Sequence, residues 1–113
     1  ARALAEFLKA NTSLEMLSLQ ANEISAEGAR ALAEALTANK SLKELNLNGN
    51  KIGDEGAIPL AEVLKSNETL TELNLTASEI GADGLRALAE ALEVNRTLRK
   101  LILNENELGD EKA

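Results

Sequence analysis

The string Leu-x-x-Leu-x-Leu occurs four times in this chain, and successive copies begin 28 residues apart. The copies are Leu14/Leu17/Leu19, Leu42/Leu45/Leu47, Leu70/Leu73/Leu75 and Leu98/Leu101/Leu103. A fixed period of this length is typical of solenoid proteins, in which each unit buries its apolar side against its neighbours. Because a solenoid offers a long open surface in place of a closed pocket, the repeat favours a binding or scaffold module over an enzyme.

Each repeat predicts one strand and one helix. The last two leucines of the string are two residues apart, which places them on one face of a short strand. Further along, apolar residues recur at steps of three and four, which places them on one face of a helix. These sets are Ala29, Leu32, Ala33 and Leu36; Ala57, Leu60, Ala61 and Leu64; and Leu85, Leu88, Ala89 and Leu92.

We expect a single α/β domain over residues 1–113, because no Pro/Gly/Ser-rich linker interrupts the period. Its helix–strand units are 1–28, 29–56, 57–84 and 85–113. Solenoid ends need polar caps, and neither end of this sequence shows one. Phe7 at one end and Leu103 at the other therefore predict self-association through the termini, or contact with flanking repeats.

Composition argues against several classes of site. The chain carries 19 acidic and 12 basic residues, a net charge of −7, which argues against nucleic acid or an anionic membrane as partner. It has no cysteine and no histidine, which removes thiolate metal sites and the usual general base. We therefore expect no enzymatic activity, cofactor, metal or small-molecule substrate. Without cysteine or a signal segment, we expect a cytoplasmic location.

Polar residues mark the predicted helix boundaries. Acidic residues such as Asp54 and Glu55 follow each helix start, where a carboxylate meets free N–H groups and the positive end of the helix dipole. Asparagine is expected to end each helix because it tolerates the left-handed conformation. The predicted starts are Ser25, Gly53, Gly81 and Gly109, and the predicted ends are Asn11, Asn39, Asn67 and Asn95.

Two helical positions are expected to shape the packing. Glycine recurs in the first helical turn at positions 28, 56 and 84, which we interpret as close approach to the neighbouring strand. Pro59 takes the place of an alanine in the flanking repeats. Since proline removes a helix hydrogen bond, we expect this helix to begin near Glu55 or to kink.

Three surface patterns have ordinary structural explanations. Arg30/Glu34 and Arg86/Glu90 are four residues apart and predict weak pairing on a solvated helix face. The acidic pair Asp110/Glu111 stands alone, whereas calcium needs several converging oxygen ligands. The glycosylation pattern recurs at the helix-ending asparagines, where a structural role explains it.

After the leucines, each repeat continues with Asn-x-Ile or a variant, then glycine and a Leu-Ala-x-x-Leu helix. With its 28-residue period, this pattern resembles the leucine-rich repeat family, in its ribonuclease-inhibitor-like subclass, which includes the sensor arms of NOD-like receptors. The resemblance implies a curved α/β horseshoe with a parallel sheet on the concave face and helices on the convex face. It also implies a ladder of side chains that hydrogen-bond the turn backbones, formed by Asn22, Asn50, Ser78 and Asn106. Ser78 is shorter and should reach fewer backbone groups.

The resemblance implies protein binding, mostly through the concave sheet. The candidate residues flank the inward leucines: Met16, Ser18, Gln20, Glu44, Asn46, Asn48, Glu72, Asn74, Thr76, Lys100, Ile102 and Asn104. None is Trp, Tyr or Arg, the residues that dominate binding hot spots, so a spacer role in a longer parent stays open. Two further alternatives stay open: an engineered or consensus-like module without a natural partner, and a GTPase-activating-type support role on a longer parent.

Overall fold

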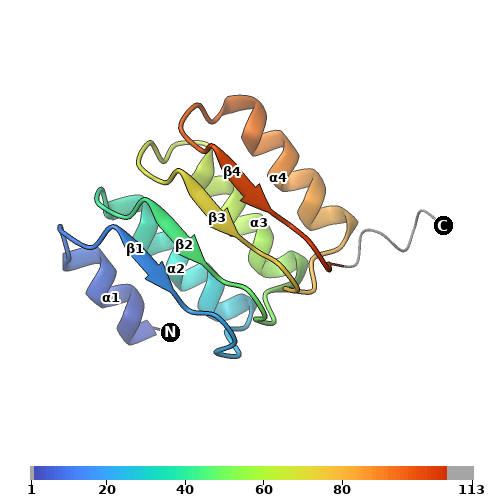
Figure 1. Ribbon diagram of the computed structural model, residues 1–113, viewed down its shortest axis with the longest axis horizontal. Coiled ribbons are helices and arrows are strands. Elements are labelled where there is room, and N and C mark those ends of the chain that lie inside the picture. Colours follow the sequence, from blue (N-terminus) through green and yellow to red (C-terminus); the bar gives the residue numbers. More distant parts are fainter. Residues whose placement is uncertain (1, 107–113) are drawn as a thin grey trace.

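The computed structural model describes residues 2–106, with side chains from residue 4 onward. Its elements in chain order are α1 (Arg2–Ala10), β1 (Met16–Ser18), α2 (Ala26–Ala38), β2 (Glu44–Asn46), α3 (Gly53–Leu64), β3 (Glu72–Asn74), α4 (Ala82–Val94) and β4 (Lys100–Ile102). The strands form one parallel sheet in the order β1-β2-β3-β4, and the helices form a second layer on one side of it (Figure 1). The predicted α/β fold with a parallel sheet and helices is confirmed. The predictions on Gly109, Asp110 and Glu111 lie outside the described residues.

The strands pair so that residues one period apart lie side by side. Leu17, Leu45, Leu73 and Leu101 form one row across the sheet. Leu45 and Leu73, on the two central strands, are buried, whereas Leu17 and Leu101 are half-buried. Each outer strand has a single neighbouring strand within residues 2–106, which explains the difference. The register follows directly from the period of the leucine string.

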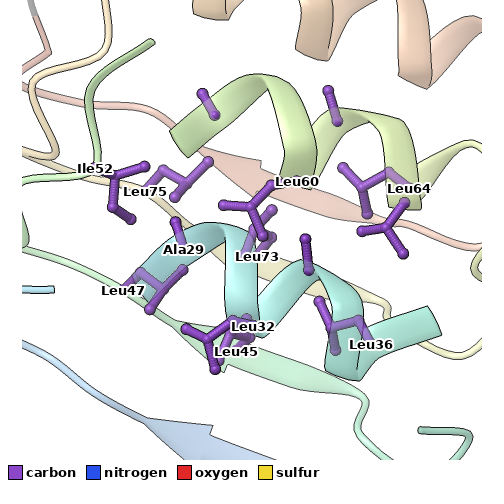
Figure 2. Packing of buried hydrophobic residues seen from close by; sticks show 14 of the residues in the cluster. Ala29, Leu32, Leu36, Leu45, Leu47, Ile52, Leu60, Leu64, Leu73 and Leu75 are labelled. Atoms are coloured by element: carbon purple, nitrogen blue, oxygen red, sulfur yellow. The ribbon is translucent and has the colours of Figure 1, made fainter. Parts of the chain in front are cut away.

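The core lies between the two layers. Figure 2 shows the leucines of α2 and α3 turned toward the leucines of β2 and β3, with Leu32, Leu45, Leu60 and Leu73 among them. Each of these four side chains is at most 1% exposed. Burying a leucine contributes about 1.5–3 kcal/mol relative to leaving it in water, so these rows stabilise the array.

The predicted apolar faces of α2 and α3 are confirmed, but that of α4 is only partly covered. Leu88 is buried, whereas Ala89 and Leu92 are exposed. Ala61, at the place of Ala89 in α3, is buried. Among the described helices α4 packs against α3 only, so one side of its apolar face is left uncovered in this part of the chain.

The glycine in the first helical turn does mark a close approach, but to a helix. A Cβ at Gly56 would lie 2.6 Å from Ile52 Cγ2, 3.0 Å from Ala29 Cβ and 3.1 Å from Ala26 Cα. Ala26 and Ala29 belong to the first turn of α2. The predicted contact with a neighbouring strand is therefore wrong, because the first turns of adjacent helices are what meet here.

The predicted helix starts are largely confirmed. Ser25 and Gly81 are the N-caps of α2 and α4, while Gly53 is the first residue of α3. The carboxylate of Asp54 was expected at the start of its own helix. Its hydrogen bonds run instead to backbone N–H groups at the start of α4.

The conformation expected at the helix ends is wrong. Asn39 and Asn95 are the C-cap residues of α2 and α4, but their backbones are extended, with φ of −79° and −71°. The role of asparagine at this place is hydrogen bonding through its side chain. Asn39 Oδ1 accepts from the N–H groups of Ser41 and Leu42, and Asn39 Nδ2 donates to two carbonyl oxygens of the preceding repeat. Asparagine thus joins neighbouring repeats at this turn.

Helix α3 departs from its neighbours at both ends. It begins at Gly53, one position earlier in the repeat than α2 or α4, and contains Pro59 in its interior. The late start near Glu55 is therefore wrong, and the alternative expectation, a kink, stays a prediction. The helix also ends early, at Leu64, and the N–H of Lys65 donates to the carbonyl of Glu62 in a tightened last turn.

Ion pairs on the helix surface are three residues apart, and not four as expected. Arg86 pairs with Asp83 at 3.1 Å, one turn before it, and no pair with Glu90 forms. No pair joins Arg30 and Glu34 within residues 4–106. Such exposed pairs contribute little to stability.

Candidate protein-binding surface

The predicted binding residues lie in three rows on the side of the sheet away from the helices, which we call the sheet face. The strand-start row holds Met16, Glu44, Glu72 and Lys100, and the strand-end row holds Ser18, Asn46, Asn74 and Ile102. The turn row holds Gln20, Asn48, Thr76 and Asn104. All twelve side chains are exposed or half-buried, in alternation with the inward leucines. The structure therefore presents them on one surface.

Backbone pairing continues beyond the strands and holds the turn row in place. The N–H of Ala21 donates to the carbonyl of Asn48, and the N–H of Gly49 donates to the carbonyl of Thr76. The N–H of Ala77 donates to the carbonyl of Asn104 in the same way. These bonds are 2.8–2.9 Å long. The turn row is thus a fixed extension of the sheet.

A shallow hollow of about 270 Å³ lies at the β1–β3 end of the sheet face. Its lining is Met16, Leu17, Ser18, Glu44, Leu45, Asn46, Glu72 and Asn74. Six of the twelve predicted candidates meet here, whereas Lys100, Ile102 and the whole turn row lie outside it. Met16 forms an apolar wall and is 64% exposed. The hollow combines exposed apolar surface, two carboxylates and amide groups.

The two asparagines of the hollow are held by the turns that follow them. Asn46 Oδ1 accepts from the N–H of Asn48, and Asn74 Oδ1 accepts from the N–H and Oγ1 of Thr76. Within residues 4–106 neither Nδ2 group donates a hydrogen bond. Their amide oxygens are therefore held by the turns, while their NH₂ groups have no hydrogen-bond partner among the described residues.

The asparagine ladder implied by the sequence is present in the described turns. Asn50 Oδ1 accepts from the N–H groups of Asn22 and Ile24, at 2.9 and 2.8 Å. Its Nδ2 donates to the carbonyls of Leu19 and Leu47. Asn106 makes the corresponding four hydrogen bonds. Its Oδ1 accepts from the N–H groups of Ser78 and Ile80, and its Nδ2 donates to the carbonyls of Leu75 and Leu103. The ladder fixes the turns that border the sheet face.

Ser78 reaches fewer backbone groups, as predicted. Its Oγ donates to the carbonyls of Leu47 and Thr76 and accepts no backbone N–H. The turn beside it follows a different path. Glu23 and Glu79, at the same place in the flanking repeats, have a positive φ near +60°, whereas Lys51 does not. In this turn Gly53 has the positive φ, at +63°. The N–H of Gly53 then donates to the backbone carbonyl of Ser78.

Sequence reasoning missed a groove on the helix side. A space of about 410 Å³ lies between α2 and α3, lined by Arg30, Ala33, Glu34, Thr37, Pro59, Glu62, Val63 and Ser66. Pro59 lies in it, and Ile58 beside it is exposed. The replacement of the usual Arg-Ala pair by Ile58-Pro59 was the available sequence signal. Within the described residues, no group of three or more acidic side chains is placed to hold a metal ion.

A family profile described as "TMOD/LMOD Leucine-rich domain" matches residues 29–111, most of the chain. The chain belongs to this leucine-rich repeat family. A second profile, "Leucine Rich repeat", matches residues 10–33. The resemblance to leucine-rich repeat proteins is therefore confirmed, while the ribonuclease-inhibitor-like subclass stays a prediction. A comparison with curated protein sequences found no significant match.

Two solved structures of this tropomodulin and leiomodin family resemble the chain. "Leiomodin-1 Actin-Binding Site 2 (ABS2)" superposes with a TM-score of 0.83 and 30% identity, over 89% of this chain and 60% of that one. The tropomodulin C-terminal domain of Caenorhabditis elegans superposes with a TM-score of 0.82 and 21% identity, over 92% of this chain and 64% of that one. The second likeness shows the fold alone. The chain spans less than two thirds of the length of either structure.

No helix in residues 2–106 combines the length and the apolar character that a membrane span requires.

Proposed function

We propose that this chain is a non-enzymatic protein-binding domain and that the sheet face receives its partner. The family match over residues 29–111 supports this proposal. The rows of the sheet face support it further, because exposed polar side chains and Met16 share one surface there. The 28-residue period also favours the ribonuclease-inhibitor-like subclass and a curved solenoid whose concave side is the sheet face.

Actin is the first partner to test. The name of the leiomodin-1 structure states an actin-binding site, and the chain shares 30% identity with it. The present chain covers 60% of that structure, so an assay with this chain does not include contacts made by the remaining part. We therefore expect binding weaker than that of a full-length family member.

Titration of fluorescently labelled chain with monomeric actin, together with co-sedimentation with actin filaments, tests this function. We expect saturable binding that Glu44→Lys on the sheet face weakens. Glu34→Lys is the matched control, because it makes the same charge change at an exposed position on α2. Equal loss in both variants would move the binding surface away from the sheet. Absence of binding to either form of actin would exclude actin as the partner.

The alternatives make different predictions in further assays. A consensus-like module without a natural partner would fail a binding screen against cell extract as well as the actin assays. A GTPase-supporting role would show as faster GTP hydrolysis when a longer parent is added to a GTPase. Cytoplasmic location and self-association stay predictions, and light scattering over a range of concentrations tests the second.

A further inference from the structure

Two carboxylates of the hollow face one another from neighbouring strands. Glu44 of β2 pairs in register with Glu72 of β3, and adjacent strands lie about 4.8 Å apart. Like charges directly opposite each other on neighbouring strands are destabilising. Lys100 is the register partner of Glu72 on the other side, but its ammonium does not form an ion pair with it. Neither carboxylate therefore forms an ion pair within residues 4–106.

The ion pairs of the described chain all lie on helices. They join Lys9 to Glu6, Lys65 to Glu62 and Arg86 to Asp83. The sheet face has no ion pair in the described range, although the hollow holds two carboxylates and no basic side chain. A cation supplied from outside the chain would relieve the repulsion between Glu44 and Glu72. The net charge of −7 steers a basic partner toward the domain by long-range attraction.

The wall of the hollow is apolar. Met16 lies in the same row as Glu44, one strand away, and is the most exposed large apolar side chain of the described region. The thioether of methionine is polarisable and makes favourable contacts with aromatic rings and aliphatic groups. Beside it, Leu17 and Leu45 contribute to the lining. The hollow thus offers an apolar contact next to the two carboxylates.

We propose that this hollow binds an arginine side chain of the partner, with an apolar neighbour of that arginine seated on Met16. The inference rests on the proposed function, since it names the chemistry of the same surface. The planar guanidinium presents donors on several edges and can donate to both Glu44 and Glu72 at once, whereas a lysine ammonium acts as a point charge. The NH₂ groups of Asn46 and Asn74, one row further along, donate to backbone carbonyls of the bound segment.

Selection from a random peptide library displayed on phage tests the proposal without a known partner. We expect the selected peptides to carry arginine next to an aliphatic or aromatic residue. In a synthetic copy of a selected peptide, arginine to lysine should weaken binding about tenfold, which corresponds to about 1.4 kcal/mol. Glu44→Gln and Glu72→Gln in the domain should each weaken it to a similar extent, and Met16→Ala should weaken it without changing the preference for arginine.

Two controls separate site chemistry from general charge. Glu34→Gln and Glu90→Gln remove the same charge at exposed positions of α2 and α4 and should leave peptide affinity unchanged. Backbone amide NMR shifts should cluster at residues 16–18, 44–46 and 72–74. Selected peptides without arginine, equal affinity for the lysine peptide, or equal loss in the helix-face controls would each overturn the proposal.

The proposed function and this inference fail in different ways. If actin does not bind but arginine peptides bind as described, actin is the wrong partner and the hollow keeps its assigned chemistry. Actin binding that Glu44→Lys weakens would support the sheet face as the binding surface. If Glu44→Gln and Glu72→Gln then change neither actin affinity nor peptide affinity, the arginine site is wrong. Circular dichroism of each variant confirms that the fold is retained.

Discussion

Asp54 Oδ1 lies 2.7 Å from the backbone nitrogen of Gly81, across the boundary between two repeats. The same oxygen accepts from the N–H of Gly84 at 3.1 Å. Gly81 is the N-cap of α4 and has no side chain to accept these bonds. Asp54 therefore provides from α3 the acceptor that a serine or aspartate N-cap normally provides within its own helix.

Replacing Asp54 by alanine should destabilise the domain by about 1 kcal/mol, the usual loss for an N-cap acceptor. Asp54→Asn keeps an acceptor oxygen and should cost a few tenths of that amount. Urea unfolding followed by circular dichroism measures both values. Glu55→Ala is the control, because Glu55 is exposed and makes no such contact. Equal stability of Asp54→Ala and Glu55→Ala would show that α4 does not depend on this cap.

Replacing a ladder asparagine by alanine should destabilise the domain more than replacing Ser78, the serine that interrupts the ladder. Asn50→Ala removes four hydrogen bonds at a site that is 1% exposed, so we expect a loss of about 3 kcal/mol from unsatisfied backbone groups. Ser78→Ala removes two bonds and should lose about 1 kcal/mol. Asn48→Ala, on the sheet face, serves as the control. A larger loss for Ser78→Ala than for Asn50→Ala would contradict this order.

Interactions set by the period could be predicted from the sequence. The leucine string gives the strand register directly, so that Leu45 faces Leu73, and the helical spacing places Leu32 and Leu60 in the core. The twelve sheet-face candidates followed from the same alternation. These features depend on local periodicity, which the sequence displays.

Other contacts between repeats could not be predicted, because they depend on distances between backbones. Asn39 was expected to adopt a left-handed conformation, yet its side chain reaches the carbonyl of Leu8 in the preceding repeat. The hollow between Met16, Glu44 and Glu72 requires three strands to be placed side by side. The hydrogen bond from the N–H of Gly53 to the backbone carbonyl of Ser78 also joins two repeats.

Gly56→Ala should destabilise the domain by about 2 kcal/mol, although alanine normally favours a helix by up to about 1 kcal/mol over glycine. The added Cβ would lie 2.6 Å from Cγ2 of the buried Ile52. Removing that methyl group with Ile52→Ala should relieve part of the clash, so the double variant should be more stable than the sum of the single losses predicts. Thermal and urea unfolding of the four proteins measure this coupling. Strict additivity would show that the clash with Ile52 is not the cause.

Asn39→Asp should make the stability of the domain depend on pH. The substitution keeps the acceptor oxygen for the N–H groups of Ser41 and Leu42. It also places a carboxyl oxygen, in place of an NH₂ group, against the carbonyls of Leu8 and Asn11, which now lie 2.8 and 3.0 Å from Nδ2. Burial and the two carbonyl oxygens disfavour the ionised form, so the pKa of the introduced carboxyl rises above its unfolded value of about 3.9.

The sign of the effect follows from that direction. A carboxyl whose folded pKa is raised binds its proton more tightly in the native state, so the variant is most stable below the unfolded pKa and loses stability as the pH rises through the folded pKa. Urea unfolding at several pH values, compared with the wild type, measures the loss. Asn11→Asp is the matched control, because Asn11 accepts from Ser13 and Leu14 but its Nδ2 donates to no carbonyl within residues 4–106. A parallel pH dependence in both variants would show that the bonds between repeats at Asn39 do not set its protonation.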